Sequence, residues 1–144
     1  MIQLTPDFKE FLRLLNSNKV EYLLIGGYAV GYYGYPRPTG DMDVWVGVNR
    51  VNAERVVNAL REFGFSCQPE LLLEENRVIR MGVPPFRIEV LTTIDGVTFP
   101  DCYSKRLEVL IDGVETNLID LAQLKVNKKA SGRSKDISDL ENLP

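Results

Sequence analysis

The segment between residues 24 and 46, LIGGYAVGYYGYPRPTGDMDVWV, constrains the fold more than any other part of the sequence. An apolar strand ends at Gly26-Gly27, and a second apolar strand follows Asp41 and Asp43. Glycines directly after a strand let a phosphate group approach the backbone. Carboxylates two residues apart on a strand share one face, about 7 Å apart at Cα, so both can reach one hard cation such as Mg²⁺ or Mn²⁺. This combination predicts chemistry on a nucleoside triphosphate.

The composition excludes several classes of enzyme. We expect residues 1–144 to form a single domain with a real core, because 44% of the residues are hydrophobic. The net charge of −3 argues against a basic protein that coats nucleic acid. The chain has no His, which removes Ser-His-Asp and Cys-His triads and the usual zinc ligands. Any general base must therefore be a carboxylate, a Lys, a Tyr or a water.

The cysteines and the hydropathy of the sequence indicate the cellular compartment to expect. Cys67 and Cys102 are far apart in the sequence and suggest no disulfide framework, so a reducing, cytoplasmic setting fits them. The longest stretch without charge, residues 22–36, is too short and too rich in Gly to span a membrane. We expect no membrane partner.

The order of helical and strand patterns predicts an α/β (α+β) fold with a single mixed β-sheet flanked by helices. Helices are expected over residues 5–17, 28–33, 52–63, 118–129 and 135–143. Strands are expected over residues 20–25, 42–48, 78–81 and 87–91, and as a hairpin of residues 107–111 and 114–116 around Asp112-Gly113.

Glu89 is the candidate for a third carboxylate, in the strand FRIEVLT. If it shares the face of Asp41 and Asp43, it could bind metal or take a proton, and the set would suit two-metal phosphoryl transfer. An alternating strand could equally turn Glu89 to solvent.

Basic residues occur on both sides of this constellation. Arg37 and Thr39 lie just before the acids, where Arg37 could clamp a phosphate or Pro36 and Pro38 could hold a structural loop. A basic cluster near the C-terminus contains Lys125, Lys128, Lys129, Arg133 and Lys135. A solvated helix face is its simplest interpretation, and contact with a triphosphate or with RNA is the functional one.

The order of these motifs resembles the nucleotidyltransferase superfamily, which has the DNA-polymerase-β-like fold. The matching residues are Gly26, Gly27, Gly34, Arg37, Thr39, Asp41, Asp43 and Glu89. The tail resembles the ending of a small bacterial and archaeal branch related to abortive-infection type IV toxins. Its K…GR-x-KD-x-x-D pattern is formed by Lys125, Arg133, Lys135, Asp136 and Asp139. In this chain Tyr28 follows Gly27 where the family often has Ser, and Glu89 replaces the usual Asp.

The resemblance implies roles for single residues. Asp41, Asp43 and Glu89 would be catalytic and would ligate Mg²⁺ or Mn²⁺, with Glu89 as the third ligand or the general base. Nucleotide-binding residues would be Gly26 and Gly27, which hold the β,γ-phosphates, together with Arg37, Thr39 and Lys125. The reaction would move a nucleoside monophosphate from a triphosphate to an acceptor hydroxyl on RNA, protein or a small molecule, with release of pyrophosphate.

Two other functions stay open. The first is a catalytically degenerate nucleotide-binding module, or an antitoxin-like partner in a two-component toxin–antitoxin system, which the small size and Glu89 suggest. The second is a glycosyltransferase that uses D-x-D with a nucleotide sugar. The chain is short for that class and the upstream Gly-Gly has no role there, so this function ranks last.

Overall fold

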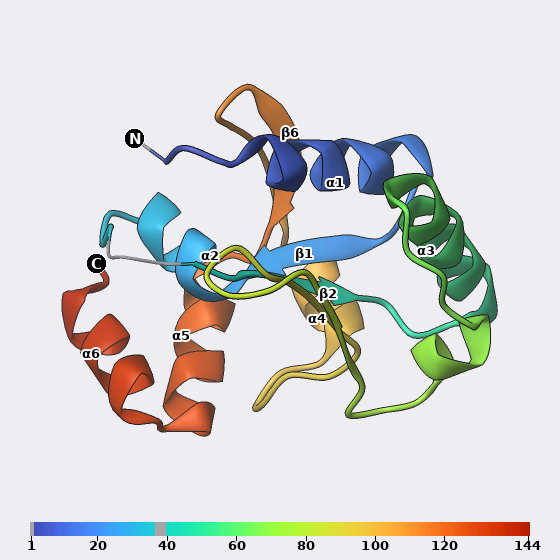
Figure 1. Cartoon of the computed structure of the whole chain (residues 1–144). Coiled ribbons are helices and arrows are strands. Elements are labelled where there is room, and N and C mark those ends of the chain that lie inside the picture. Colours follow the sequence, from blue (N-terminus) through green and yellow to red (C-terminus); the bar gives the residue numbers. More distant parts are fainter. Residues whose placement is uncertain (1, 37–39) are drawn as a thin grey trace.

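The computed structural model describes residues 2–36 and 40–144, which form a six-stranded mixed sheet with helices packed around it (Figure 1). The strands are β1 (Tyr22–Ile25), β2 (Met42–Val46), β3 (Val78–Met81), β4 (Ile88–Leu91), β5 (Leu107–Ile111) and β6 (Val114–Leu118). The helices are α1 (Pro6–Ser17), α2 (Gly26–Tyr32), α3 (Arg50–Phe63), α4 (Phe99–Ser104), α5 (Leu121–Ser131) and α6 (Ser134–Asn142), with a 3-10 turn, η1 (Pro69–Leu73). The expected fold class is confirmed.

Local capping signals set the ends of the longer helices. The Thr5 hydroxyl accepts a hydrogen bond from the Phe8 N–H at 3.1 Å and begins α1. The Asn49 side chain caps α3 in the same way. Gly64 ends α3 at a φ of 102°, a left-handed conformation that favours glycine at this position.

The core is formed by the central strands and the buried faces of the helices around them, with α1 and α3 contributing many of its side chains. All four residues of β1 are buried, as is Trp45 on β2. Helices α1 and α3 pack against each other, with the rings of Phe11 and Phe63 in edge-to-face contact at 5.2 Å (Figure 1). Helices α5 and α6 pack together at another side of the sheet (Figure 1). No helix of the described residues is both long enough and apolar enough to cross a membrane.

The strand order β3-β4-β2-β1-β6-β5 places the predicted acids beside one another. Strand β2 pairs with β1 in antiparallel fashion, which sets Asp43 opposite Ile25. It pairs with β4 in parallel fashion, which sets Asp43 opposite Glu89. The end of β1, the start of β2 and the start of β4 therefore meet at one edge of the sheet.

Several boundaries differ from the sequence-based expectation. Helix α2 begins at Gly26 rather than at Tyr28, so the Gly-Gly pair forms its first turn. Helix α5 begins at Leu121 because Leu118 still belongs to β6 and Asp120 caps the helix. Helix α4 and the turn η1 were not expected, since elements of six and five residues are too short for a helical period to be recognised.

Candidate active site

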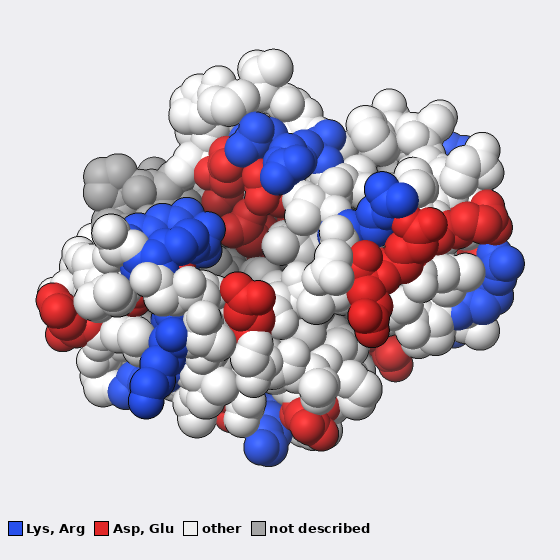
Figure 2. Space-filling model, turned by 90° about the horizontal axis from the view of Figure 1, so that it is seen from below, with Lys and Arg blue, Asp and Glu red and all other residues white. Residues whose placement is uncertain are grey.

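A polar cavity of about 800 Å³ lies where β1, β2 and β4 meet α5 and α6. Its lining includes Gly26, Gly27, Asp41, Asp43, Arg80, Arg87, Glu89, Asp95, Asn127, Lys128, Ser131, Arg133 and Lys135. Figure 2 looks onto a hollowed face of the molecule, where acidic side chains lie inside the hollow and basic side chains flank it on opposite sides. Carboxylates surrounded by cations form an arrangement that can attract both a divalent metal and an anionic substrate.

The start of α2 lies directly against Asp43. Gly26 has a φ of +69°, and a Cβ atom placed there would lie 2.5 Å from Asp43 Oδ2. A side chain at position 26 would therefore require both a strained backbone and a displaced carboxylate. Gly26 lets the end of β1 approach the acid on the neighbouring strand.

Asp43 is the most perturbed acid of the cavity. Its pKa is raised to about 7, first by burial and then by the negative charges of Glu89 and Asp41, while the positive charge of Lys135 opposes the rise. Asp43 Oδ1 is buried and has no hydrogen-bond partner among the described residues. A buried carboxylate oxygen without a partner is costly, and a bound cation would remove that cost.

Two arginines neutralise the other carboxylates. One nitrogen of Arg87, Nη2, lies 3.1 Å from Asp41 Oδ2 and 3.0 Å from Glu89 Oε1. Arg80, from β3, lies 3.3 Å from the same Glu89 oxygen. Both carboxylates thus point toward guanidinium groups.

The carboxylates of the cavity have the chemistry to bind a hard divalent cation, but their oxygen atoms do not converge on one point. Asp41, Asp43 and Glu89 line one cavity, and oxygen is the donor that Mg²⁺ and Mn²⁺ prefer. Within residues 2–36 and 40–144, however, no three Asp, Glu, Cys or His side chains are arranged so that they could hold a metal ion together. Asp41 and Glu89 would have to turn from Arg87 to share a cation with Asp43.

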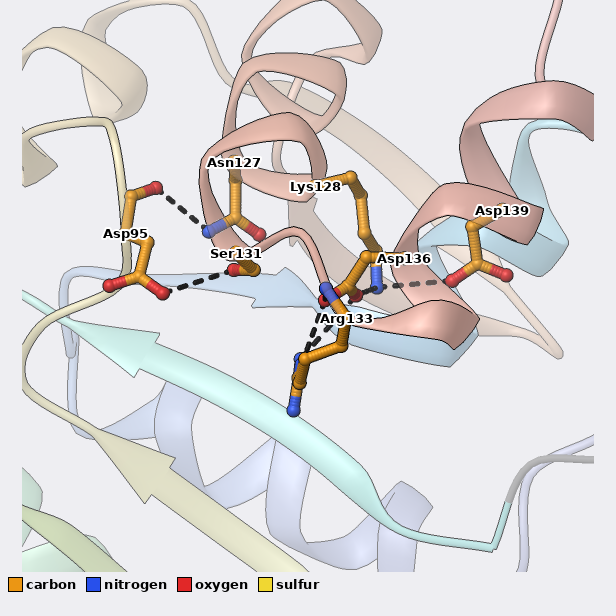
Figure 3. Close-up of polar contacts among 7 residues, drawn as sticks. All are labelled: Asp95, Asn127, Lys128, Ser131, Arg133, Asp136 and Asp139. Carbon is orange, nitrogen blue, oxygen red and sulfur yellow. Dashed lines mark hydrogen bonds and ion pairs between the residues drawn. The ribbon is translucent and has the colours of Figure 1, made fainter.

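A buried ion-pair network holds the C-terminal wall of the cavity. The Lys128 ammonium lies 3.1 Å from Asp136 Oδ1 and 3.1 Å from Asp139 Oδ2, and all three side chains are buried. Arg133 donates from Nε to Asp136 Oδ2 at 2.8 Å, and its guanidinium extends from the α5–α6 junction toward the sheet (Figure 3). The carboxylates therefore fix α6 on α5 and orient Arg133 at the same time.

A second set of polar contacts ties the loop after β4 to α5 (Figure 3). Asn127 Nδ2 donates to the backbone carbonyl of Asp95 at 2.9 Å, and Ser131 donates to the Asp95 carboxylate at 3.2 Å. Gly96 allows this approach, because a Cβ atom there would lie 2.6 Å from Ala130 Cβ. These hydrogen bonds hold the loop after β4 against α5 at the rim of the cavity.

The structure brings together only part of the residue set expected from sequence. Gly26, Gly27, Asp41, Asp43 and Glu89 all line the cavity. The ammonium of Lys125 instead donates to the backbone carbonyl of Pro144, and Lys125 does not belong to the cavity lining. Arg37 and Thr39 lie outside the described residues.

The cavity also contains five residues that were not expected from the sequence: Arg80, Arg87, Asp95, Asn127 and Ser131. A signal for Arg87 was available, since it lies two residues before Glu89 and so shares its face if the strand extends that far. Asp95, Asn127 and Ser131 carried no comparable signal, because their contacts join segments more than 30 residues apart.

Comparison with known proteins addresses the fold. No family model matches the chain, and no curated protein matches it either. The structure is similar to the crystal structure of a Thermotoga maritima protein provisionally named a nucleotidyltransferase, with a TM-score of 0.64 and 15% identity over 96% of this chain and 93% of that one. It is also similar to an antigenic nucleotidyltransferase-like protein of Paracoccidioides brasiliensis, with a TM-score of 0.55 and 19% identity over 96% of this chain and 76% of that one. At such identities the likeness concerns the fold alone, and the chain has the mixed-sheet fold of these nucleotidyltransferase structures.

Proposed function

We propose that this protein is a metal-dependent nucleotidyltransferase, a phosphorus-group transferase that moves a nucleoside monophosphate from a triphosphate to an acceptor hydroxyl. The observation that carries the proposal is the meeting of Asp41, Asp43 and Glu89 in one cavity with Gly26 and Gly27. The fold of the two similar structures supports it independently. Positioning and charge neutralisation would supply most of the rate of such a transfer.

The acceptor oxygen attacks the α-phosphorus in line with the bond to the β-phosphate. A new O–Pα bond forms, and the bond from Pα to the bridging oxygen breaks with its electron pair leaving on pyrophosphate. Glu89 acts either as the general base that takes the proton of the attacking hydroxyl or as the third ligand of the metal. A bound Mg²⁺ or Mn²⁺, held by Asp41 and Asp43 with or without Glu89, would neutralise charge on the phosphates.

The remaining residues of the cavity bind the substrate. The backbone at Gly26 and Gly27 holds the β- and γ-phosphates, and Arg133 and Lys135 face them from the C-terminal wall. The sequence motif alone predicts that Arg37 and Thr39 contact the phosphates. The same prediction for Lys125 has less support, since its ammonium donates to the carbonyl of Pro144.

The proposed class of acceptor rests on the resemblance of the C-terminal sequence pattern to a known branch of nucleotidyltransferases. The pattern formed by Lys125, Arg133, Lys135, Asp136 and Asp139 favours the branch related to abortive-infection toxins. We therefore propose RNA or protein as the acceptor before a small molecule, and a second protein that restrains the activity.

A transfer assay tests the proposal. Each α-labelled triphosphate is incubated with the protein, Mg²⁺ or Mn²⁺, total RNA and cell protein, beside the variant Asp41→Asn/Asp43→Asn. A Glu54→Gln variant, which removes an exposed acid from α3, is the matched control. Label should move to one acceptor class in the wild type and the control and should stay on the triphosphate in the double variant. Transfer that survives the double substitution would contradict the assigned roles.

One observation favours a second function, a nucleotide-binding module without turnover. Arg87 and Arg80 already neutralise Asp41 and Glu89, so the described residues hold no ready-made metal site. Under this function, calorimetry would detect triphosphate binding while no label moves with any acceptor. The Asp41→Asn/Asp43→Asn variant would then bind the triphosphate as well as the wild type does.

A further inference from the structure

Arg87 holds together two carboxylates from different segments, Asp41 just before β2 and Glu89 within β4. Its Nη2 atom lies 3.1 Å from Asp41 Oδ2 and 3.0 Å from Glu89 Oε1. Without a cation between them, these carboxylates and Asp43 would repel one another inside one cavity. Arg87 thus neutralises the negative charge of these carboxylates, as a divalent metal would do.

The backbone fixes Arg87 in this position. The Met42 N–H donates to the Arg87 carbonyl at 2.9 Å, at the start of the parallel pairing of β2 and β4. Asp41 and Arg87 lie directly before β2 and β4, two residues ahead of Asp43 and Glu89, so the four side chains lie on the same face at the start of this strand pair. The Arg87 side chain is only 28% exposed, and its Nε is buried without a partner among the described residues. The ion pairs are therefore less screened than those on an open surface.

The guanidinium and a divalent metal compete for the same oxygen atoms. Asp41 Oδ2 and Glu89 Oε1 point at Arg87, whereas Asp43 Oδ1 is left without a partner. A cation at Asp43 would compete with Arg87 for Asp41 Oδ2 and Glu89 Oε1. The absence of a ready-made set of three ligands among the described residues agrees with this arrangement.

We propose that Arg87 is an exchangeable counter-ion, which neutralises Asp41 and Glu89 before metal binds and then moves its guanidinium to the phosphates. The inference rests on the proposed function, because it concerns the same cavity. Arg87 lines the same cavity as Gly26 and Gly27, so phosphates bound by these glycines would lie near Arg87. A guanidinium can bind phosphate with two parallel hydrogen bonds, which compensates for the carboxylates that it leaves.

The first experiment measures metal binding without nucleotide. Mn²⁺ is titrated into the wild type, Arg87→Gln and Arg87→Lys, and free Mn²⁺ is followed by electron paramagnetic resonance. Removal of the competing cation should tighten Mn²⁺ binding by about fivefold in Arg87→Gln, the size expected for loss of a partly buried ion pair. Arg87→Lys should fall between the two, because an ammonium is a point charge that bridges both carboxylates less well. The Lys variant also provides the answer if Arg87→Gln fails to fold.

A matched control separates the local effect from a change in net charge. Arg50→Gln removes another arginine that pairs with a glutamate, at 3.1 Å from Glu70, away from the cavity. Its affinity for Mn²⁺ should equal that of the wild type. Equal or weaker Mn²⁺ binding in both Arg87 variants, or no Mn²⁺ binding by any of the proteins, would overturn the inference.

The second experiment adds the substrate. Calorimetry with a non-hydrolysable triphosphate at saturating Mn²⁺ should show weaker binding in Arg87→Gln, by about tenfold for the loss of a charged phosphate contact. Opposite changes in metal and triphosphate affinity are not expected of a merely structural arginine, whose loss would weaken both. Triphosphate binding that is unchanged in Arg87→Gln would overturn the second half of the inference.

The two proposals fail in different ways. If no label is transferred but Mn²⁺ binds more tightly to Arg87→Gln, the counter-ion role holds and the proposed enzymatic function falls. If label is transferred but the Mn²⁺ affinities do not differ, the function holds and the inference about Arg87 is wrong.

Discussion

Gly26 and Asp43 are in such close contact that a Cβ atom at position 26 would lie 2.5 Å from Asp43 Oδ2. The glycine directly follows β1 and the acid lies on the neighbouring strand β2, so the two motifs of the sequence meet as one structural feature. Any side chain at position 26 would push on the carboxylate that has the most perturbed pKa of the cavity.

Gly26→Ala should therefore damage both the fold and the site. We expect a loss of about 1–3 kcal/mol in the free energy of unfolding, from left-handed backbone strain and from the contact with Asp43. Urea denaturation measures the loss, and Mn²⁺ affinity should fall with it. Gly113→Ala is the control, because Gly113 has a φ of +80° with nothing within 4 Å of its Cβ position. Equal losses in the two variants would show that the contact with Asp43 carries no energy.

Lys128→Met should destabilise the junction of α5 and α6. Lys128 lies 3.1 Å from carboxylate oxygens of both Asp136 and Asp139, and its removal leaves buried negative charge without that cation. Loss of one partner from a buried ion pair typically costs about 3–5 kcal/mol, and Arg133 would offset part of this through Asp136. Thermal unfolding measures the change. Lys129→Met, on the next and exposed position of α5, should leave the midpoint almost unchanged.

Asp136 should make stability sensitive to acid. Burial acts to raise its pKa, but hydrogen bonds from Arg133 and Lys128 outweigh burial, so the pKa lies below its usual value of 3.8. The folded state therefore holds this proton less tightly than the unfolded state does. Its contribution is complete above the unfolded pKa and is lost as the pH falls through the lower folded pKa.

Asp136→Asn tests this dependence. We expect the variant to be less stable than the wild type at neutral pH and to lose less stability between about pH 5 and pH 2. Urea unfolding at several pH values provides the measurement. If the free energy of unfolding falls equally steeply with decreasing pH in both proteins, Asp136 does not titrate between about pH 5 and pH 2.

Lys135 and Lys125 should differ in their contribution to triphosphate binding. Lys135 lines the cavity and its charge acts on Asp43, whereas Lys125 donates to Pro144. Lys135→Ala should weaken binding of a triphosphate analogue by about five- to tenfold, and Lys125→Ala by less than about twofold. Calorimetry in the presence of Mg²⁺ compares the two, which remove the same charge. A larger effect at Lys125 would favour the expectation drawn from the sequence motif.

Asn52→Ala should weaken the link between α3 and the central strands. The buried Asn52 amide donates to the carbonyls of Gly47 at 2.8 Å and Glu21 at 3.0 Å, and accepts from the Glu21 N–H at 2.8 Å. Unpaired backbone groups left behind should cost about 2–4 kcal/mol in total. Chemical denaturation measures the change. Asn142→Ala, which breaks only a local bond to Ser138 at the exposed end of α6, should cost far less.

Local patterns predicted most helices and strands because they depend on neighbouring residues. Thr5 caps α1 as expected, Gly64 ends α3 as expected, and the turn at Asp112-Gly113 joins β5 to β6. These signals act over a few residues, where backbone conformation and side-chain spacing decide the outcome. The short α4 and η1 carried no such signal and were missed.

The sequence by itself determined that Gly26-Gly27, Asp41 and Asp43 occur between two buried strands, and that Glu89 lies in a third strand. Only the tertiary structure decided that Glu89 lies opposite Asp43, because a long connection separates the two strands and no local turn fixes their register. It also directed Arg87 to the carboxylates and Lys125 away from the cavity. Such contacts join residues that are distant in the chain, and the direction of a long charged side chain is set by the charges that folding brings near it.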